Sequence, residues 1–172
     1  PILTNSQFNK FKKFFSKKIK VIDCTFDISL SLKDRIEAIR EETETAVREG
    51  STCLILSDKN ISNQKASIPS ILTVGAVHSH LVKHGLRGYC SLNVECSDAL
   101  DTHSFAVLIG VGATTVNPYL AIDSIYQRFE KKLFGKADFE SCVVKFKKSI
   151  DAGLLKIMSK MGISVISSYR GG

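Results

Sequence analysis

Hydrophobic positions along this chain follow two alternating spacings, one typical of helices and the other of strands. Apolar residues recur every three or four positions in six segments, which predicts an amphipathic helix in each. Five shorter apolar runs between or after them predict β-strands. With cap residues and terminating glycines included, the helices are expected over residues 5–16, 31–50, 69–85, 101–109, 120–133 and 138–162. The strands are expected over residues 20–24, 52–57, 89–96, 113–116 and 163–168.

Residue types at the ends of these segments support the predicted helix boundaries. Ser31, with Asp34 after it, makes a start like a capping box, and Asp138 is a second N-cap. Side-chain oxygens at such positions accept hydrogen bonds from free backbone N–H groups. Gly50 and Gly162 follow the last apolar position of their helices, where glycine is favoured. The helix over 69–85 should bury one apolar face, consisting of Ile71, Leu72, Ala76, Leu81 and Val82.

Strands and helices alternate at intervals of about 30 residues, which predicts an α/β fold. The expected architecture is a mostly parallel sheet flanked by helices, either Rossmann-like or a partial β/α barrel. The run from Cys53 to Leu56 is continuously apolar, as in a parallel strand buried on both faces. One face of the strand over 89–96 should be buried, and it consists of Cys90, Leu92, Val94 and Cys96.

The composition is that of a folded domain with a basic surface. Of 172 residues, 44% are hydrophobic and 24% are charged, which excludes disordered and collagen-like chains. The net charge of +7 comes partly from six lysines within residues 10–20. Lys10, Lys13 and Lys17 share a predicted helix face that could contact nucleic-acid phosphates. The phenylalanines between these lysines have the pattern of a core-facing side of the helix rather than of platforms that stack on bases. We therefore interpret the lysines as a solvated basic face.

The chain shows no targeting or membrane segment. A charged stretch followed by an apolar one, as in a signal peptide, is missing. No apolar stretch reaches the ~18 residues of a membrane span. Five cysteines are an odd number, so we expect free thiols in a reducing compartment.

Polar residues follow three predicted strands at their carboxyl ends, where α/β folds carry functional loops. Serine and aspartate are also common helix caps, and Asn-Pro is a turn signal, so ordinary structural roles remain open. The three groups are Ser57-Asp58-Lys59-Asn60, Ser97-Asp98 and Asn117-Pro118-Tyr119.

Two histidines have the spacing of a metal site without the rest of the motif. His80 and His84 are four residues apart on one predicted helix, a geometry that holds zinc when acidic or cysteine partners exist. Leu81 stands where an H-E-x-x-H site has its glutamate. The sequence therefore favours solvated or packed histidines and no metal site.

Motifs for other cofactors are incomplete. Cys90 and Cys96 are better explained as packed thiols, because iron–sulfur ligation needs three or four thiolates. Gly110 and Gly112 are followed by Thr115 where the dinucleotide fingerprint has its third glycine. No Walker-type phosphate loop or nucleophile elbow occurs.

Several long strings of residues resemble the central domain of the glutamate synthase large subunit. They are 55–58 (ILSD), 68–81 (IPSILTVGAVHSHL), 103–113 (HSFAVLIGVGA) and 116–120 (VNPYL). The strings at 153–164 (GLLKIMSKMGIS) and 168–171 (SYRG) are similar to the junction into the FMN-binding synthase domain. Ser79 departs from the family, which usually has a histidine there. The family also continues where this chain stops, and Pro1 is not a methionine, so we expect an excised piece.

The resemblance implies two parts in this chain. Residues 1–150 would be the C-terminal part of the central, connecting α/β domain, and 151–172 the junction into the synthase domain. The enzyme implied makes L-glutamate from L-glutamine and 2-oxoglutarate. Its amidotransferase domain releases ammonia, which passes through a tunnel to an FMN domain, and an iron–sulfur cluster relays electrons from NAD(P)H or ferredoxin. The central domain links the two catalytic domains and borders the tunnel.

Transferred residue by residue, the resemblance implies no catalytic residue, cofactor site or metal ligand here. Pro1 stands in place of the amino-terminal cysteine nucleophile, and the cluster cysteines and FMN-binding strands have no counterpart. The residues expected to line or border the tunnel are Ser57, Asp58, Asn117 and Tyr119.

The partners implied are the amidotransferase and FMN domains of the same polypeptide, with a small NAD(P)H-oxidising subunit or ferredoxin for the whole enzyme. Neither membrane nor nucleic acid is expected, and the location implied is the cytoplasm or a plastid. Two other functions fit the residues alone. One is a free-standing basic α/β module that binds nucleic acid or a phosphate-bearing ligand, and the other is a complete small β/α enzyme.

Overall fold

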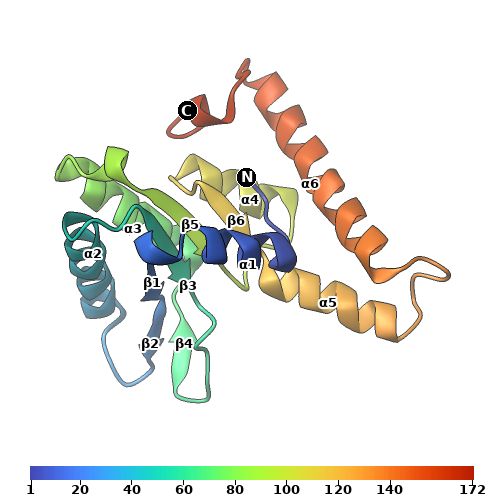
Figure 1. Ribbon diagram of the computed structural model, residues 1–172, viewed down its shortest axis with the longest axis horizontal. Coiled ribbons are helices and arrows are strands. Elements are labelled where there is room, and N and C mark those ends of the chain that lie inside the picture. Colours follow the sequence, from blue (N-terminus) through green and yellow to red (C-terminus); the bar gives the residue numbers. More distant parts are fainter.

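The centre of the molecule is a four-stranded parallel sheet in the order β1-β3-β5-β6 (Figure 1). The computed structural model describes all 172 residues. The strands of this sheet are β1 (Ile19–Asp23), β3 (Cys53–Ser57), β5 (Ser91–Glu95) and β6 (Thr115–Asn117). The helices are α1 (Asn5–Phe14), α2 (Leu32–Arg48), α3 (Ser70–Lys83), α4 (Thr102–Gly110), α5 (Tyr119–Glu130) and α6 (Phe139–Lys160). Single 3-10 turns are η1 (Ser16–Lys18), η2 (Arg87–Tyr89) and η3 (Ile166–Ser168).

The strand order identifies the sheet as part of a β/α barrel. Each strand pairs with the one that precedes it in this sheet, and a helix connects each pair. Right-handed crossovers that always step in the same direction leave their helices on one face, as in a barrel wall. A Rossmann fold reverses direction at its switch point, and this sheet does not. The α/β prediction is confirmed, and the barrel-like form of it is the one observed.

The N-terminal segment adds to the free edge of the sheet before the chain crosses to the opposite edge. Ile2 forms a parallel bridge with Val116 in β6. A full capping box at Thr4 and Gln7 then starts α1. The helix leads to β1 at the far edge and lies across the strands in Figure 1. The first 20 residues thereby connect the two edge strands of the sheet, β6 and β1.

A small second ladder extends the carboxyl end of the sheet. β2 (Thr25–Asp27) pairs with β4 (Lys65–Ser67) in an antiparallel sheet. Neither of these two strands is among the five that the sequence predicts. The three-residue strands carry too little apolar periodicity to be seen in the sequence.

The core lies between the sheet and its helices and extends without a break into α6. Leu54 and Leu92 are fully buried at its centre. From α6, Ile150 and Leu154 join the same cluster of 25 buried residues, opposite Phe105 of α4. The domain division expected at residues 150 and 151 falls inside α6 and remains a prediction.

One sequence-based prediction about an element is wrong, and another is correct but incomplete. The strand expected over residues 163–168 is instead a loop with the turn η3, and Gly171 N–H donates to the carbonyl of Gly110 at 3.0 Å. The edge of the sheet beside β6 is taken by Ile2 instead. The strand over 89–96 buries its predicted face of Cys90, Leu92, Val94 and Cys96. Its other face is buried as well, since Asn93 and Glu95 are 0% and 3% exposed.

The buried face of α3 also differs from the prediction. Ile71, Leu72 and Val82 are 43–54% exposed, whereas Leu81 is buried as expected. The face toward the core consists of Ser70, Thr73, Val74, Val77 and Leu81. The helix is apolar on most of its circumference, so periodicity alone did not determine which side packs.

Candidate functional site

The four strands of the main sheet end in one row of polar side chains. The register pairs Asp23 with Ser57, Ser57 with Glu95, and Glu95 with Asn117. Side chains at one level of a parallel sheet point to the same face, so strand geometry alone brings these four residues together. The candidate site is this row with the residues that contact it. We call it the carboxyl-edge cluster, consisting of Lys12, Asp23, Ser57, Asp58, Lys59, Glu95, Ser97, Asn117 and Tyr119.

Glu95 is the hub of the carboxyl-edge cluster. Its Oε1 accepts from Lys12 Nζ at 2.7 Å and lies 3.1 Å from Lys59 Nζ. Its Oε2 accepts from Ser57 Oγ at 2.7 Å. Burial by itself would raise the pKa of Glu95, but hydrogen bonds from Lys12, Ser57 and Lys59 outweigh it and lower that pKa. The buried carboxylate is therefore ionised and fully paired at neutral pH.

Asp58 follows Ser57 and binds the next loop along the sheet. Its Oδ2 accepts from Ser97 N–H at 2.9 Å and from Ser97 Oγ at 2.6 Å. The side chain is 3% exposed, and the other oxygen, Oδ1, has no hydrogen-bond partner. Burial and the nearby Asp58 charge raise the pKa of Tyr119, whose ring lies under Lys59 Nζ at 5.0 Å. Tyr119 is therefore a neutral phenol at every physiological pH.

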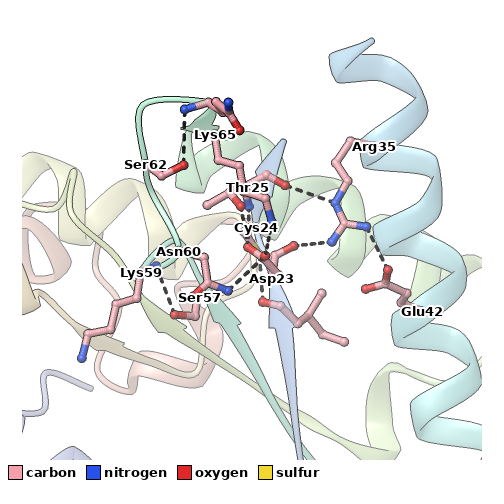
Figure 2. Close-up of polar contacts among 12 residues, drawn as sticks. Asp23, Cys24, Thr25, Arg35, Glu42, Ser57, Lys59, Asn60, Ser62 and Lys65 are labelled. Carbon is pink, nitrogen blue, oxygen red and sulfur yellow. Dashed lines mark hydrogen bonds and ion pairs between the residues drawn. The ribbon is translucent and has the colours of Figure 1, made fainter. Parts of the chain in front are cut away.

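The two ends of the row have structural roles. Asn117 Nδ2 donates to the Leu3 carbonyl and to Asn5 Oδ1, both at 3.0 Å, and so holds the entry to α1. Figure 2 shows the other end, where Asp23 Oδ1 accepts from the Thr25 hydroxyl at 2.7 Å and Asp23 Oδ2 from Asn60 Nδ2 at 3.0 Å. These hydrogen bonds lower the pKa of Asp23 despite its partial burial.

Arg35 of α2 fastens the turn after β1. Its guanidinium donates to the carbonyls of Asp23 and Thr25 and pairs with Glu42 at 2.8 Å (Figure 2). One carbonyl belongs to the last residue of β1 and the other to the first residue of β2, and the planar fork satisfies them together. The carboxyl edge is thus fixed by side chains from α1, from α2 and from the loops that follow β3 and β5.

Little space is left within the cluster for a substrate. The cavity that touches Asp58 and Glu95 has a volume of about 10 Å³, enough for no more than one water. A wider cleft of about 710 Å³ lies between α1, α5 and α6, but its titratable residues are Lys10, Asp123, Tyr126 and Glu140 on separate walls. The cluster has the properties of a rigid, water-poor wall rather than of a reaction chamber.

The residues of the cluster do not fit an FMN phosphate. The lysines nearest to the strand ends, Lys12 and Lys59, are already paired with Glu95, and Asp58 adds a second buried carboxylate. A phosphate placed there would meet two negative charges in a poorly solvated site. That this chain binds no FMN stays a prediction.

The cysteines are dispersed rather than gathered as cluster ligands. All five are free thiols, and four of them are buried. Burial raises the pKa of Cys24 to about 12 and also raises the pKa of Cys90 and Cys96. Thiolates are the form that binds metal, so these sites do not suit an iron–sulfur cluster.

The structure brings together part of what the sequence pointed to. Ser57, Asp58, Asn117 and Tyr119 all lie at the carboxyl edge. Whether they border a tunnel is not tested by this placement. Glu95 and Lys12 were missed, because an alternating strand and a basic helix both suggested exposed side chains. For Glu95, the one signal available in the sequence was that every strand of the main sheet has a polar residue at its last position.

Three lysines near the N-terminus, two on α1 and one on η1, make no ion pair. Lys10, Lys13 and Lys17 are all exposed, as the solvated-face interpretation expects. None of the helices is long and apolar enough to cross a bilayer.

Comparison with known proteins gives a match over the whole chain. A family model described as "glutamate synthase central domain" matches residues 1–172. The glutamate synthase (NADPH) large chain of Azospirillum brasilense is 51% identical over 175 residues, which cover 100% of this chain and 12% of that protein. The corresponding chain of Bacillus subtilis is 41% identical, over 99% of this chain and 11% of that protein. The chloroplastic ferredoxin-dependent glutamate synthase of Spinacia oleracea is 38% identical, over 99% and 12%.

Solved structures with the same fold are distant in sequence. A mutant flavocytochrome b2 with pyruvate bound has a TM-score of 0.60 at 15% identity, over 99% of this chain and 52% of that one. DHODH from Eimeria tenella has a TM-score of 0.57 at 15% identity, over 89% and 37%. At this identity the likeness concerns the fold alone. Together, these matches do not support the alternative of a basic nucleic-acid module.

Proposed function

Because this chain belongs to the glutamate synthase central domain family, we propose that it works as the connecting domain of a glutamate synthase large chain. The observation that carries the proposal is the family match over residues 1–172, without a gap in coverage. The chain spans 11–12% of the large chains named above.

The enzyme we infer makes L-glutamate from L-glutamine and 2-oxoglutarate. Ammonia released by an amidotransferase domain reaches a synthase domain that carries FMN and an iron–sulfur cluster. Those domains are the first partners of this chain, with a small NAD(P)H-oxidising subunit or ferredoxin as the electron source. The named relatives include both an NADPH and a ferredoxin-dependent form, which is consistent with either source. The chain would act in the cytoplasm, or in a plastid as for the chloroplastic relatives.

We place the carboxyl-edge cluster at the border of the ammonia path. A wall of such a path must keep a fixed shape and exclude bulk water. Glu95 and Asp58 are buried and held by short hydrogen bonds, which supports a fixed shape. Asp58 Oδ1 keeps an unused lone pair that could accept an N–H of passing ammonia. Tyr119 stays neutral and adds no charge that would hold an ion.

The chain itself contributes no catalytic group in this proposal. Purified alone, it should hydrolyse no glutamine and show no flavin absorbance. Glutaminase activity or stoichiometric flavin in the isolated chain would contradict this part of the proposal.

Uncoupling of the two half-reactions tests the role of the cluster. In the complete large chain, Asp58→Asn and Tyr119→Phe should let ammonia escape, so that more glutamine is hydrolysed than 2-oxoglutarate consumed. Glutaminase activity, and synthase activity with added ammonium, should each be retained. Asp123→Asn, an exposed position on α5, is the matched control and should keep the two rates equal. Equal rates in both cluster variants would remove the cluster from the ammonia path.

A further inference from the structure

Packing of α2 against α3 supplies the acidic partner that the histidine pair lacks in the sequence. His80 and His84 are one turn apart on α3, and Glu44 approaches them from α2. One ligand atom from each residue lies within 4.8 Å of the other two. Glu44 Oε2 is 2.6 Å from His80 Nε2 and 3.8 Å from His84 Nδ1. The three side chains are 22%, 18% and 34% exposed, so an ion in solvent can reach them.

We propose that Glu44, His80 and His84 bind a divalent late transition-metal ion such as Zn²⁺. Two imidazole nitrogens and one carboxylate oxygen suit zinc and its neighbours rather than Mg²⁺ or Ca²⁺, which take oxygen ligands. Three protein ligands leave a fourth tetrahedral position for water.

The required movement is small. Ligand bonds of roughly 2.0–2.2 Å in a tetrahedral site place ligand atoms about 3.3 Å apart. The contact between Glu44 and His80 must open, and the contact between Glu44 and His84 must close, each by less than about 1 Å. The two histidine nitrogens lie within 4.8 Å of each other and must approach by at most about 1.5 Å. Side-chain rotation is the movement that provides such shifts.

Neighbouring groups orient the ligands. Arg48 donates to Glu44 Oε1 at 2.8 Å, which holds the carboxylate so that Oε2 faces the histidines. Such contacts around ligands are typical of metal sites. Binding exchanges the hydrogen bonds from His80 to Glu44 and from His84 to the His80 carbonyl for metal–ligand bonds. The ion would join α2 to α3 on the outer surface, away from the carboxyl-edge cluster, so this inference is independent of the proposed function.

Zinc titration of variants tests the site. The background for all samples is Cys142→Ser without an affinity tag, because Cys142 is the thiol that is not fully buried. Equilibrium dialysis should find one Zn²⁺ per chain. Glu44→Gln and His84→Ala should weaken binding by at least about tenfold, as loss of a ligand exceeds the effect of losing a supporting contact. His103→Ala, an exposed histidine on α4, is the matched control and should bind as the parent does.

Two further readouts keep the outcome clear if a variant folds poorly. Cu²⁺ bound to the parent should show hyperfine coupling to two imidazole nitrogens in its EPR spectrum. Zn²⁺ at a hundredfold excess over the dissociation constant should raise the thermal midpoint of the parent by about 5–10 °C and leave His84→Ala unchanged. No saturable binding in the parent, or equal affinity in the parent and His84→Ala, would overturn the proposal. The three residues would then only join the two helices by hydrogen bonds.

Discussion

At the scale of single residues, the main finding is a buried carboxylate that two lysines and a serine hold in its charged form. Glu95 is 3% exposed, yet its contacts keep its pKa below the ordinary value of 4.5. A buried charge with its partners is not strong evidence of stability, but removing one member leaves the others unpaired. The importance of Glu95 therefore lies in fixing the positions of Lys12, Ser57 and Lys59.

Substitution of Glu95 should destabilise the protein in a pH-dependent way. Because the folded-state pKa is lowered, the contribution of the carboxylate is present above the unfolded-state pKa and is lost as pH falls through the folded-state pKa. Glu95→Gln should therefore lower the free energy of unfolding at pH 7 by about 1–3 kcal/mol. The difference from the parent should shrink as pH falls below 4.5.

Urea unfolding at a series of pH values measures this difference. Glu49→Gln, at an exposed position with no ion pair, is the control and should stay within about 0.5 kcal/mol of the parent. A pH-independent effect of Glu95→Gln would show that shape rather than charge decides its role.

At the scale of elements, the close crossing of α4 and α6 depends on one glycine. A Cβ atom built on Gly153 would lie 2.5 Å from Thr102 Cγ2 and 2.6 Å from Thr102 Oγ1. Thr102 is the first residue of α4 and is branched at Cβ, so it has few rotamers with which to yield. Gly75 in α3 has no atom within 4 Å of the same position.

The two glycines should respond in opposite directions to alanine. Gly153→Ala should destabilise by about 1–3 kcal/mol through overpacking. Gly75→Ala should stabilise by about 0.5–1 kcal/mol through helix propensity. Combining Thr102→Ala with Gly153→Ala should recover part of the loss, because only Thr102 Cβ at 3.2 Å then remains close. Equal effects of the two single substitutions in urea unfolding would contradict the crossing as described.

At the scale of the whole molecule, α6 shares one hydrophobic core with the sheet. Ile150 and Leu154 belong to the main core, and Phe146 of α6 meets Phe105 of α4 edge to face at 6.4 Å. The C-terminal segment then returns to the end of α4. Elements that share one core are expected to unfold in one transition.

Two adjacent leucines in α6 test this cooperativity. Leu154 is 3% exposed and Leu155 is 65% exposed. Leu154→Ala should lower the free energy of unfolding by about 2–4 kcal/mol with an unchanged m-value. Leu155→Ala should change it by less than about 0.5 kcal/mol. A second transition or a reduced m-value in Leu154→Ala would mean that α6 unfolds on its own.

The sequence by itself determined the elements that have strong local signals. The six helices, their caps at Ser31 and Asp138, and four strands of a parallel sheet follow from periodicity and end residues, which act over a few positions. The placement of Ser57, Asp58, Asn117 and Tyr119 at strand ends follows in the same way. Long ordered strings of residues gave the family.

Only the tertiary structure decided which of these elements meet. Strand order separates a partial barrel from a Rossmann sheet, and neither alternative changes the local pattern. The pairing of Lys12 with Glu95 joins residues 83 positions apart, and Glu44 meets His80 across 36 positions. The segment over 163–168 has the residues of a strand, but the N-terminal Ile2 takes the position beside β6. These outcomes depend on long-range packing, which local spacing does not contain.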